Sequence, residues 1–181
     1  MDLFYANPIE EGLLYRAIES HFVDGRPWAE TRFIQRVLEY LDDGRDSVWR
    51  DCSSREDVFA RCRRLEEIYR SMRRHGCLSY RELLPPAQRE MRFLRHMEHE
   101  IVVDIGRDGE LLLVSGKHRY YLARTLGLDE IPVTFLVRHA QWMETRRAIA
   151  HGEDPDLPIE DHPDLRDLEA SESTSGHEGP S

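Results

Sequence analysis

The stretch Ser115-Gly116-Lys117-His118-Arg119 is the point from which the fold of this chain can be read. The apolar run Leu111 to Val114 just before it predicts a buried strand. Tyr120 to Leu126 predicts a compact helix that ends at Gly127, and Ile131 to Val137 predicts a second strand behind a proline. The quoted stretch is therefore a loop from which a helix begins.

The charge of this loop has the wrong sign for its position. A helix N-terminus carries a partial positive charge, so Lys117 and Arg119 there are unfavourable by about 0.3–1 kcal/mol each. A bound phosphate would balance them, because first-turn N–H groups, the exposed backbone of Gly116 and two cations would converge on it. The alternative is that both cations pair with carboxylates of the chain itself, such as Asp104 or Glu110.

Lys117 is also the only lysine among 25 basic residues. A lone lysine in an arginine-rich chain favours a role for a compact ammonium, which is how lysine engages phosphates, although an arginine-biased genome would explain it equally. The predicted phosphate or nucleotide site comprises Ser115, Gly116, Lys117, His118 and Arg119. We expect His118 to orient an oxygen or a Mg²⁺-bound water, and Asp104 to hold a metal or act as a base.

Length and composition limit the class of protein. A chain of 181 residues predicts one domain with a real core. The sequence has no apolar run near eighteen residues and no basic leader, so we expect a soluble, cytoplasmic protein without a membrane partner. Cys52, Cys62 and Cys77 form no CxxC pair, which favours buried or inert thiols in a reducing compartment.

The net charge of −10 is concentrated at the C-terminal end. Residues 151–181 hold ten acids and one arginine, so the first 150 residues carry a net charge of only −1. Glycine, proline, serine and acids dominate this segment, which predicts a disordered acidic tail over 151–181.

Three helices are predicted in the first half of the chain. Two of them, Asn7–His21 and Pro27–Leu41, form an N-terminal helical extension over residues 1–50. The third begins at a capping box after Ser53 and Ser54 and ends at Gly76. It opens the main domain, residues 51–150.

The third helix carries seven arginines, of which Arg63, Arg70 and Arg74 share one face. A basic helix face can contact nucleic-acid phosphates. The alternative is a solvated face that Glu66 and Glu67 partly neutralise.

The middle of the chain predicts a turn, a helix and a hairpin. Residues 77–84 predict a short strand or turn, 88–96 a helix, and Arg107-Asp108-Gly109 a hairpin between strands 101–105 and 110–114. His96 and His99 lack the spacing of a zinc-binding helix, so no metal site is predicted at these two histidines. A last helix ends near Ala150.

Two blocks of this sequence resemble the ParB/sulfiredoxin-like superfamily, also described as the ParB N-terminal-like or ParB-like nuclease domain. The first is Leu65–Leu78, a helix that ends in S-M-x-x-x-G-x-L, and the second is Leu113–Val133, with G-K-H-R, an alanine-containing helix, L-G and I-P-V. The resemblance covers about residues 65–137. It implies an α+β fold with a small mixed sheet and helices.

In that superfamily the loop that corresponds to Gly116–Arg119 serves nucleotide phosphates. Its members include partitioning proteins that hydrolyse CTP, sulfiredoxins that use ATP and a kinase that phosphorylates free serine. The resemblance therefore implies ATP, ADP or CTP as ligands, with Mg²⁺. Lys117 stands where sulfiredoxins have their cysteine, which excludes that reductase chemistry. The partitioning proteins continue with a helix-turn-helix region, whereas here one helix and an acidic tail follow, so we expect no site-specific DNA binding of that kind.

Three function classes stay open from the sequence. The first is a nucleotide- or phosphate-binding domain that hydrolyses the nucleotide or transfers a phosphoryl group. The second is a nucleic-acid-associated ParB-like protein, and the third is a non-enzymatic interaction module.

Overall fold

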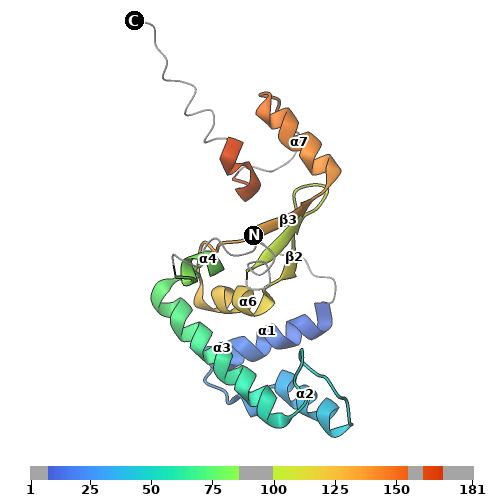
Figure 1. Cartoon of the computed structure of the whole chain (residues 1–181), viewed down its shortest axis with the longest axis vertical. Coiled ribbons are helices and arrows are strands. Elements are labelled where there is room, and N and C mark those ends of the chain that lie inside the picture. Colours follow the sequence, from blue (N-terminus) through green and yellow to red (C-terminus); the bar gives the residue numbers. More distant parts are fainter. Residues whose placement is uncertain (1–7, 86–99, 155–160, 169–181) are drawn as a thin grey trace, which may run out of the picture. The chain divides into compact units, whose positions relative to one another are not determined.

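The computed structural model describes residues 8–85, 100–154 and 161–168, and its class is α+β as expected. Figure 1 shows the helices and a small sheet. The sheet has three strands, β1 (Val102–Ile105), β2 (Leu111–Ser115) and β3 (Thr134–Arg138), in the order β2-β1-β3. The described part of the chain divides into two compact units. We call residues 8–85, 100–102 and 114–134 the helical unit, and 103–113, 135–154 and 161–168 the hairpin unit.

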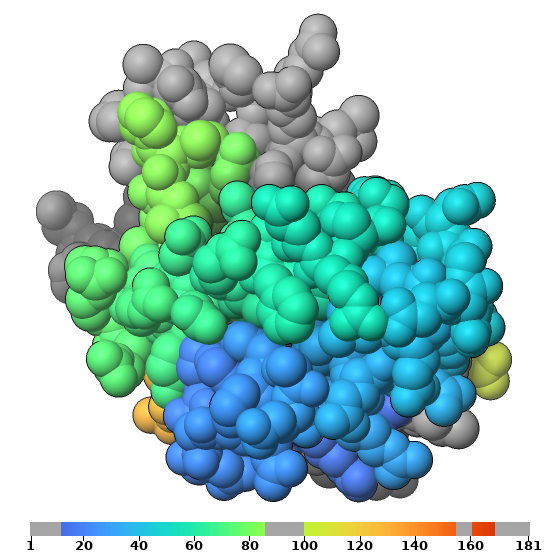
Figure 2. Space-filling model, turned by 90° about the horizontal axis from the view of Figure 1, so that it is seen from below, coloured from blue at the N-terminus to red at the C-terminus, as the bar shows by residue number. Residues whose placement is uncertain are grey.

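The helical unit is built from four main helices. They are α1 (Pro8–Phe22), α2 (Arg32–Asp42), α3 (Arg55–His75) and α6 (Lys117–Leu126). Helix α1 contacts both α2 and α6, and α3 contacts both α2 and α6. Figure 2 shows α1, α2 and α3 side by side on one face, from blue to green. The first two helices therefore pack in the same unit as α3 and α6.

Buried apolar side chains from every one of these helices meet in the helical unit. Helix α3 contributes the stripe predicted from its helical spacing, and α6 buries four consecutive residues. The buried members are Leu14, Ala17, Ile18, Ile34, Val37, Val58, Cys62, Leu65, Met72, Tyr120, Tyr121, Leu122 and Ala123.

Local hydrogen bonds fix where these helices begin. The Ser54 hydroxyl accepts the Asp57 N–H at 3.1 Å, which starts α3, and Gly76 ends it at φ 74°. The predicted single helix over residues 27–41 is wrong, because the chain forms a 3₁₀ turn, η1 (Trp28–Glu30), before α2. Buried Thr31 causes the break: its hydroxyl donates to the Trp28 carbonyl and caps Ile34 N–H.

The strand or turn predicted over residues 77–84 is also wrong. This stretch contains a one-turn helix, α4 (Tyr80–Leu83). The reason is a capping box: the Ser79 hydroxyl accepts the Glu82 N–H, and the Glu82 carboxylate accepts the Ser79 N–H at 2.7 Å. The helix predicted over 88–96 lies outside the described residues.

The sheet is mixed, and its hairpin was predicted correctly. Strands β1 (Val102–Ile105) and β2 (Leu111–Ser115) are joined by a turn with Gly109 at φ 89°. Strand β3 (Thr134–Arg138) runs parallel to β1, because Thr134 N–H bonds to Ile101 O and His139 N–H to Ile105 O. The boundary between the two units falls within these strands.

The hairpin unit has its own apolar cluster under helix α7 (Ala140–Ala150). Fully buried Trp142 lies at its centre with Ile105, Leu111 and Leu165. Phe135, Ile149 and Leu168 pack against this cluster.

Part of the segment predicted to be a disordered tail is folded. Residues 163–165 form the 3₁₀ turn η3 (Pro163–Leu165), and Asp164 is almost completely buried. Its carboxylate accepts bonds from Arg138 Nη2 at 2.6 Å and from the Trp142 indole at 2.9 Å. Acidic composition alone does not reveal that Arg138 and Trp142 donate hydrogen bonds to this carboxylate and thereby allow it to be buried. Residues 155–160 and 169–181 lie outside the described residues.

Among the described helices, none has the length and apolar character needed to cross a membrane.

Candidate functional site

The loop singled out by the sequence begins helix α6 directly. The helix starts at Lys117, three residues earlier than expected, and Gly116 is its N-cap with φ 83° and ψ 15°. A Cβ on Gly116 would lie 2.6 Å from the Glu100 carbonyl oxygen and 2.7 Å from Ile101 Cα. Only glycine allows both this left-handed backbone and the close approach of the chain at Glu100. Half-buried Ser115 ends strand β2 immediately before it.

Arg119 lies in the ion pair that the sequence offered as the alternative, although with a different acid. Its guanidinium lies 3.4 Å from Glu100 Oε2, and the two side chains are only 15% and 10% exposed. It also donates to the Leu78 carbonyl oxygen. The other Glu100 oxygen accepts the Tyr80 N–H at 2.7 Å. This geometry does not support a ligand-facing role for Arg119, which instead ties three separate chain segments together.

His118 accepts a hydrogen bond from Trp49, which lies 69 residues earlier in the chain. The Trp49 indole N–H donates to His118 Nε2 at 3.1 Å, and the ring centroids are 5.9 Å apart. Because an indole nitrogen can only donate, Nε2 must be the unprotonated nitrogen, so neutral His118 carries its proton on Nδ1. His118 can therefore present one N–H donor, but Nε2 cannot contact an oxygen or a metal-bound water while this bond lasts.

Burial and three positive charges act on the pKa of His118. Burial lowers its pKa first, and the charges of Lys117, Arg61 and Arg50 lower it further, to about 3. Arg61 Cζ lies 5.5 Å from the centre of the Trp49 ring, whose indole N–H bonds to His118. At neutral pH the histidine is therefore uncharged.

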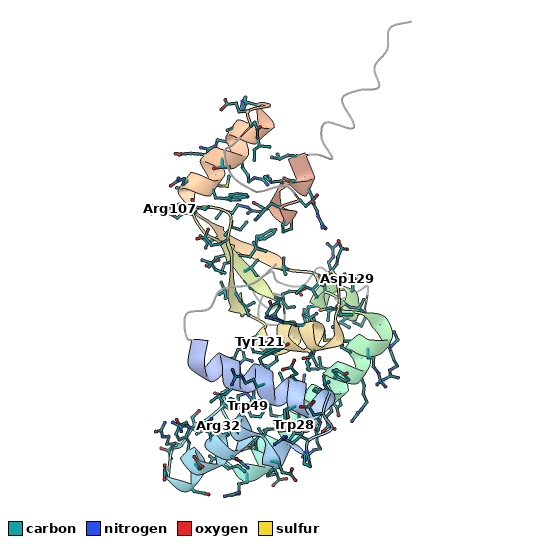
Figure 3. The ribbon with its side chains drawn as sticks, turned by 180° about the vertical axis from the view of Figure 1, so that it is seen from behind. Trp28, Arg32, Trp49, Arg107, Tyr121 and Asp129 are labelled. Carbon is teal, nitrogen blue, oxygen red and sulfur yellow. The ribbon has the colours of Figure 1, made fainter. Side chains whose placement is uncertain are left out.

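The turn that presents Trp49 has an unusual backbone. Val48 and Cys52 pair in a short antiparallel bridge, and between them Trp49 has φ 38° and Arg50 has φ 56°. Left-handed backbone in two consecutive residues other than glycine costs on the order of 1–3 kcal/mol each, so neighbouring contacts must hold this turn. Phe33 packs edge-on against Trp49 with ring centroids 5.2 Å apart. Figure 3 labels Trp49 within the helical unit.

Asp104 belongs to the hairpin unit and has a backbone partner there. Its Oδ1 accepts the Val137 N–H at 3.0 Å, a bond from strand β1 to strand β3. The other acid named as an alternative partner, Glu110, accepts the Asp108 N–H at 2.9 Å within the hairpin turn. Both carboxylates thus serve the local backbone of the sheet.

The three arginines chosen as nucleic-acid candidates lie exposed on α3 and differ in their contacts. Arg70 pairs with Glu66 at 3.0 Å, one turn away. Arg74 Nε donates to the Arg70 carbonyl oxygen at 3.1 Å. Arg63 is exposed as well. For Arg70 the geometry matches the alternative, a solvated face that Glu66 partly neutralises.

No group of three or more metal-ligating side chains that could hold an ion is found within residues 8–85, 100–154 and 161–168. His96 and His99, weighed in the sequence, lie outside those ranges. The described thiols are all free, with Cys52 and Cys62 buried and Cys77 half-buried.

Sequence reasoning missed Trp49, Arg50, Arg61 and Glu100 as neighbours of the loop. One signal for Arg61 was available: it directly precedes Cys62 in the buried stripe of α3, so its stem starts at the edge of the core. The turn at Trp49 and Arg50 gives no local signal, because neither residue type predicts a left-handed backbone.

Comparison of this chain with protein-family models, with curated proteins and with solved structures produced no match.

Proposed function

We propose that this chain is a nucleotide- or phosphate-binding domain of the ParB/sulfiredoxin-like kind, which binds its anion at the start of α6. The observation that carries the proposal is His118 at the start of α6, hydrogen-bonded to Trp49, with Lys117 directly before it and Arg61 5.5 Å from the centre of the Trp49 ring. The positive charges of Lys117 and Arg61 would attract a phosphate. Hydrolysis or transfer of the phosphoryl group would be a further step at the same place.

The local backbone suits such a ligand. The first turn of a helix has N–H groups that lack intrahelical partners, and the helix dipole favours an anion there. Gly116 is the N-cap of this turn in a left-handed conformation, and the chain at Glu100 and Ile101 fills the space beside its Cα. Lys117, half-buried at the first helical position, would supply a compact charge to the ligand.

A thermal-shift screen tests this proposal. ATP, ADP, CTP and GTP are each added with and without Mg²⁺, and the melting temperature of the wild-type chain is compared with that of Lys117→Ala. A ligand at one hundred times its Kd should stabilise by about 2.7 kcal/mol, which corresponds to roughly 5–10 °C for a chain of this size. Lys117→Ala should lose most of that shift while its melting temperature without ligand stays close to that of the wild type.

The control is Arg73→Ala, which removes one positive charge at an exposed position near the C-terminal end of α3. It should keep the full shift. If no nucleotide raises the melting temperature of the wild-type chain, the proposed function is refuted and the interaction-module reading is favoured.

A second candidate is nucleic-acid binding, favoured by the exposed arginines Arg63 and Arg74 on one face of α3. A nucleic-acid site should weaken steeply with salt, because each neutralised phosphate releases counterions. A single-nucleotide site should weaken only mildly. Titration of a labelled oligonucleotide from low to moderate salt therefore separates the two, and the double variant Arg63→Gln/Arg74→Gln should flatten the slope only if α3 is the contact.

A further inference from the structure

Residues 161–168, drawn in red in Figure 1, form a short segment that packs on the hairpin unit, and we call it the strap. Leu165 is buried in the apolar cluster around Trp142, and Leu168 packs against the same cluster. Two titratable residues of the strap are buried as well, since His162 is 5% exposed and Asp164 is 4% exposed. Burying such groups is costly unless their polar atoms have partners, so their contacts show what holds the strap in place.

Asp164 is the ionic anchor of the strap. Arg138 donates to its Oδ1 from Nη2 at 2.6 Å and from Nε at 3.0 Å. The Trp142 indole N–H donates to Oδ2 at 2.9 Å, and Arg146 Nη1 lies 3.5 Å from the same oxygen. Burial acts to raise the pKa of Asp164, but the hydrogen bonds from Arg138 and Trp142 and the positive charges of both arginines outweigh it and lower the pKa. The carboxylate therefore stays charged at mildly acid pH.

His162 is the neutral anchor, and both of its ring nitrogens have backbone partners. Nε2 lies 2.8 Å from the Gly109 carbonyl oxygen, which can only accept, so Nε2 carries the proton. Nδ1 accepts the Asp164 N–H at 3.1 Å and must be unprotonated. The ring lies against Trp142, with the ring centroids 4.4 Å apart. A second proton has to enter at Nδ1, where it faces the Asp164 N–H, so protonation breaks the hydrogen bond that begins η3.

The surroundings of docked His162 act against its positive charge. Burial lowers the pKa of His162 and is the largest influence, the Gly109 carbonyl and the charge of Asp164 oppose it, and the charge of Arg146 lowers the pKa again. The ring thus faces Asp164 of the strap, Arg146 of α7 and a carbonyl of the hairpin. Because a released His162 binds its proton more readily than the docked one, docking is strongest above about pH 6.5 and weakens as the pH falls below it.

We propose that residues 161–168 are an acid-released strap, which is docked on Trp142 at neutral pH and leaves the hairpin unit at mildly acid pH, when His162 takes up a second proton at Nδ1. Release removes His162 and Asp164 from Trp142 and leaves Arg138 and Arg146 without the Asp164 carboxylate. The hairpin unit thus changes its surface with pH. This proposal does not depend on the anion site at the start of α6.

Hydrogen exchange of the full chain, measured by NMR and corrected for the intrinsic rate at each pH, tests the release. The Asp164 and Leu165 amides report docking, because they bond to His162 Nδ1 and to the His162 carbonyl oxygen. Their protection should fall several-fold between about pH 7.5 and 5.5, and by no more than about tenfold per pH unit, since one proton is taken up. The amides of α7 should keep their protection.

Two results of this measurement would overturn the proposal. Unchanged protection of Asp164 and Leu165 over the range would show that the strap does not respond to acid. An equal loss of protection in α7 would show that the whole hairpin unit opens, and not the strap alone.

His162→Asn and His139→Asn form a matched pair of variants. His139 is also an N-cap whose Nδ1 accepts an N–H from two residues further on, that of Gln141 at 3.1 Å, but its ring is exposed. Asparagine supplies a capping acceptor and does not titrate. His162→Asn should abolish the pH dependence of strap protection, and His139→Asn should keep it in full. If His162→Asn keeps it, another group releases the strap and the assignment to His162 is wrong.

The ¹⁵N spectrum of the His162 ring gives a second readout that needs no variant. At neutral pH the ring should be protonated on Nε2 only. The pH at which Nδ1 gains its proton should coincide with the pH at which the strap loses protection. A ring that takes up this proton while the strap stays protected would overturn the proposal, and so would a strap that opens while the ring stays neutral.

Discussion

The sharpest test of the architecture around the loop is Gly116→Ala. A Cβ there would lie 2.6 Å from the Glu100 carbonyl oxygen and 2.7 Å from Ile101 Cα, both of them backbone atoms that cannot rotate aside. The residue also has φ 83°, a left-handed conformation that costs an alanine about 1–2 kcal/mol. Relieving the overlap should cost about 1–3 kcal/mol more. We expect Gly116→Ala to lower the free energy of unfolding by about 2–5 kcal/mol.

The other end of the same helix supplies the matched control. Gly127 has φ 66° and ψ 36°, and an added Cβ meets nothing within 4 Å. Gly127→Ala should therefore lose only the conformational part, about 1–2 kcal/mol. Both variants share the same gain from a less flexible unfolded chain, so the difference between them isolates the steric part.

The assay is urea unfolding followed by far-UV circular dichroism, with the slope m compared among the three proteins. A larger drop in midpoint for Gly116→Ala at constant m supports the close approach of residues 100 and 116. Equal losses of unfolding free energy in the two variants would show that the backbone near Glu100 leaves room for a side chain at residue 116. The steric explanation of Gly116 would then be wrong.

Two further predictions concern the side chains that follow Gly116. Arg119→Gln should lower the free energy of unfolding by about 3 kcal/mol, because it leaves the Glu100 carboxylate buried without its cation, while pyrophosphate affinity in calorimetry stays within twofold of the wild type. A large loss of affinity without loss of stability would show that Arg119 binds the ligand. His118 has a folded-state pKa of about 3, below its unfolded value near 6.5, so the unfolded chain binds the extra proton first. Its contribution to stability is present above pH 6.5 and is lost as the pH falls toward 3, by at most about 1.4 kcal/mol per pH unit. The free energies of unfolding of the wild type and of His118→Gln, measured across this pH range, should converge as the pH falls. A constant difference between them would contradict the burial of a neutral histidine.

Elements with local signals were predicted well. The hairpin at Arg107-Asp108-Gly109, the cap of α3 at Ser54 and the glycine end of α6 all depend on residues within a few positions of one another. The same is true of helix α7, which ends at Ala150 as expected. Capping and turn chemistry act over four or five residues, so they can be read without the fold.

The predictions that failed did so because of side-chain hydrogen bonds, some to distant parts of the chain and some to nearby residues that were overlooked. The break before α2 depends on Thr31, whose hydroxyl serves two backbone groups at once. The tail segment at Asp164 is ordered because arginine and tryptophan from elsewhere satisfy its carboxylate. The capping box of Ser79 and Glu82 could have been found, since its residues are three apart.

For the candidate site, the amino-acid sequence alone determined that a glycine loop with cations opens a short helix, because a strand, a glycine and a helix stop follow one another within a few residues. Only the tertiary structure decided which cations gather there. Arg119 pairs with Glu100, whereas Arg61, 57 residues before His118 in the chain, lies over the ring of Trp49, whose indole N–H bonds to His118. Coulomb forces act through space, and the folding of α3 and of the turn at Trp49 against α6 sets those distances.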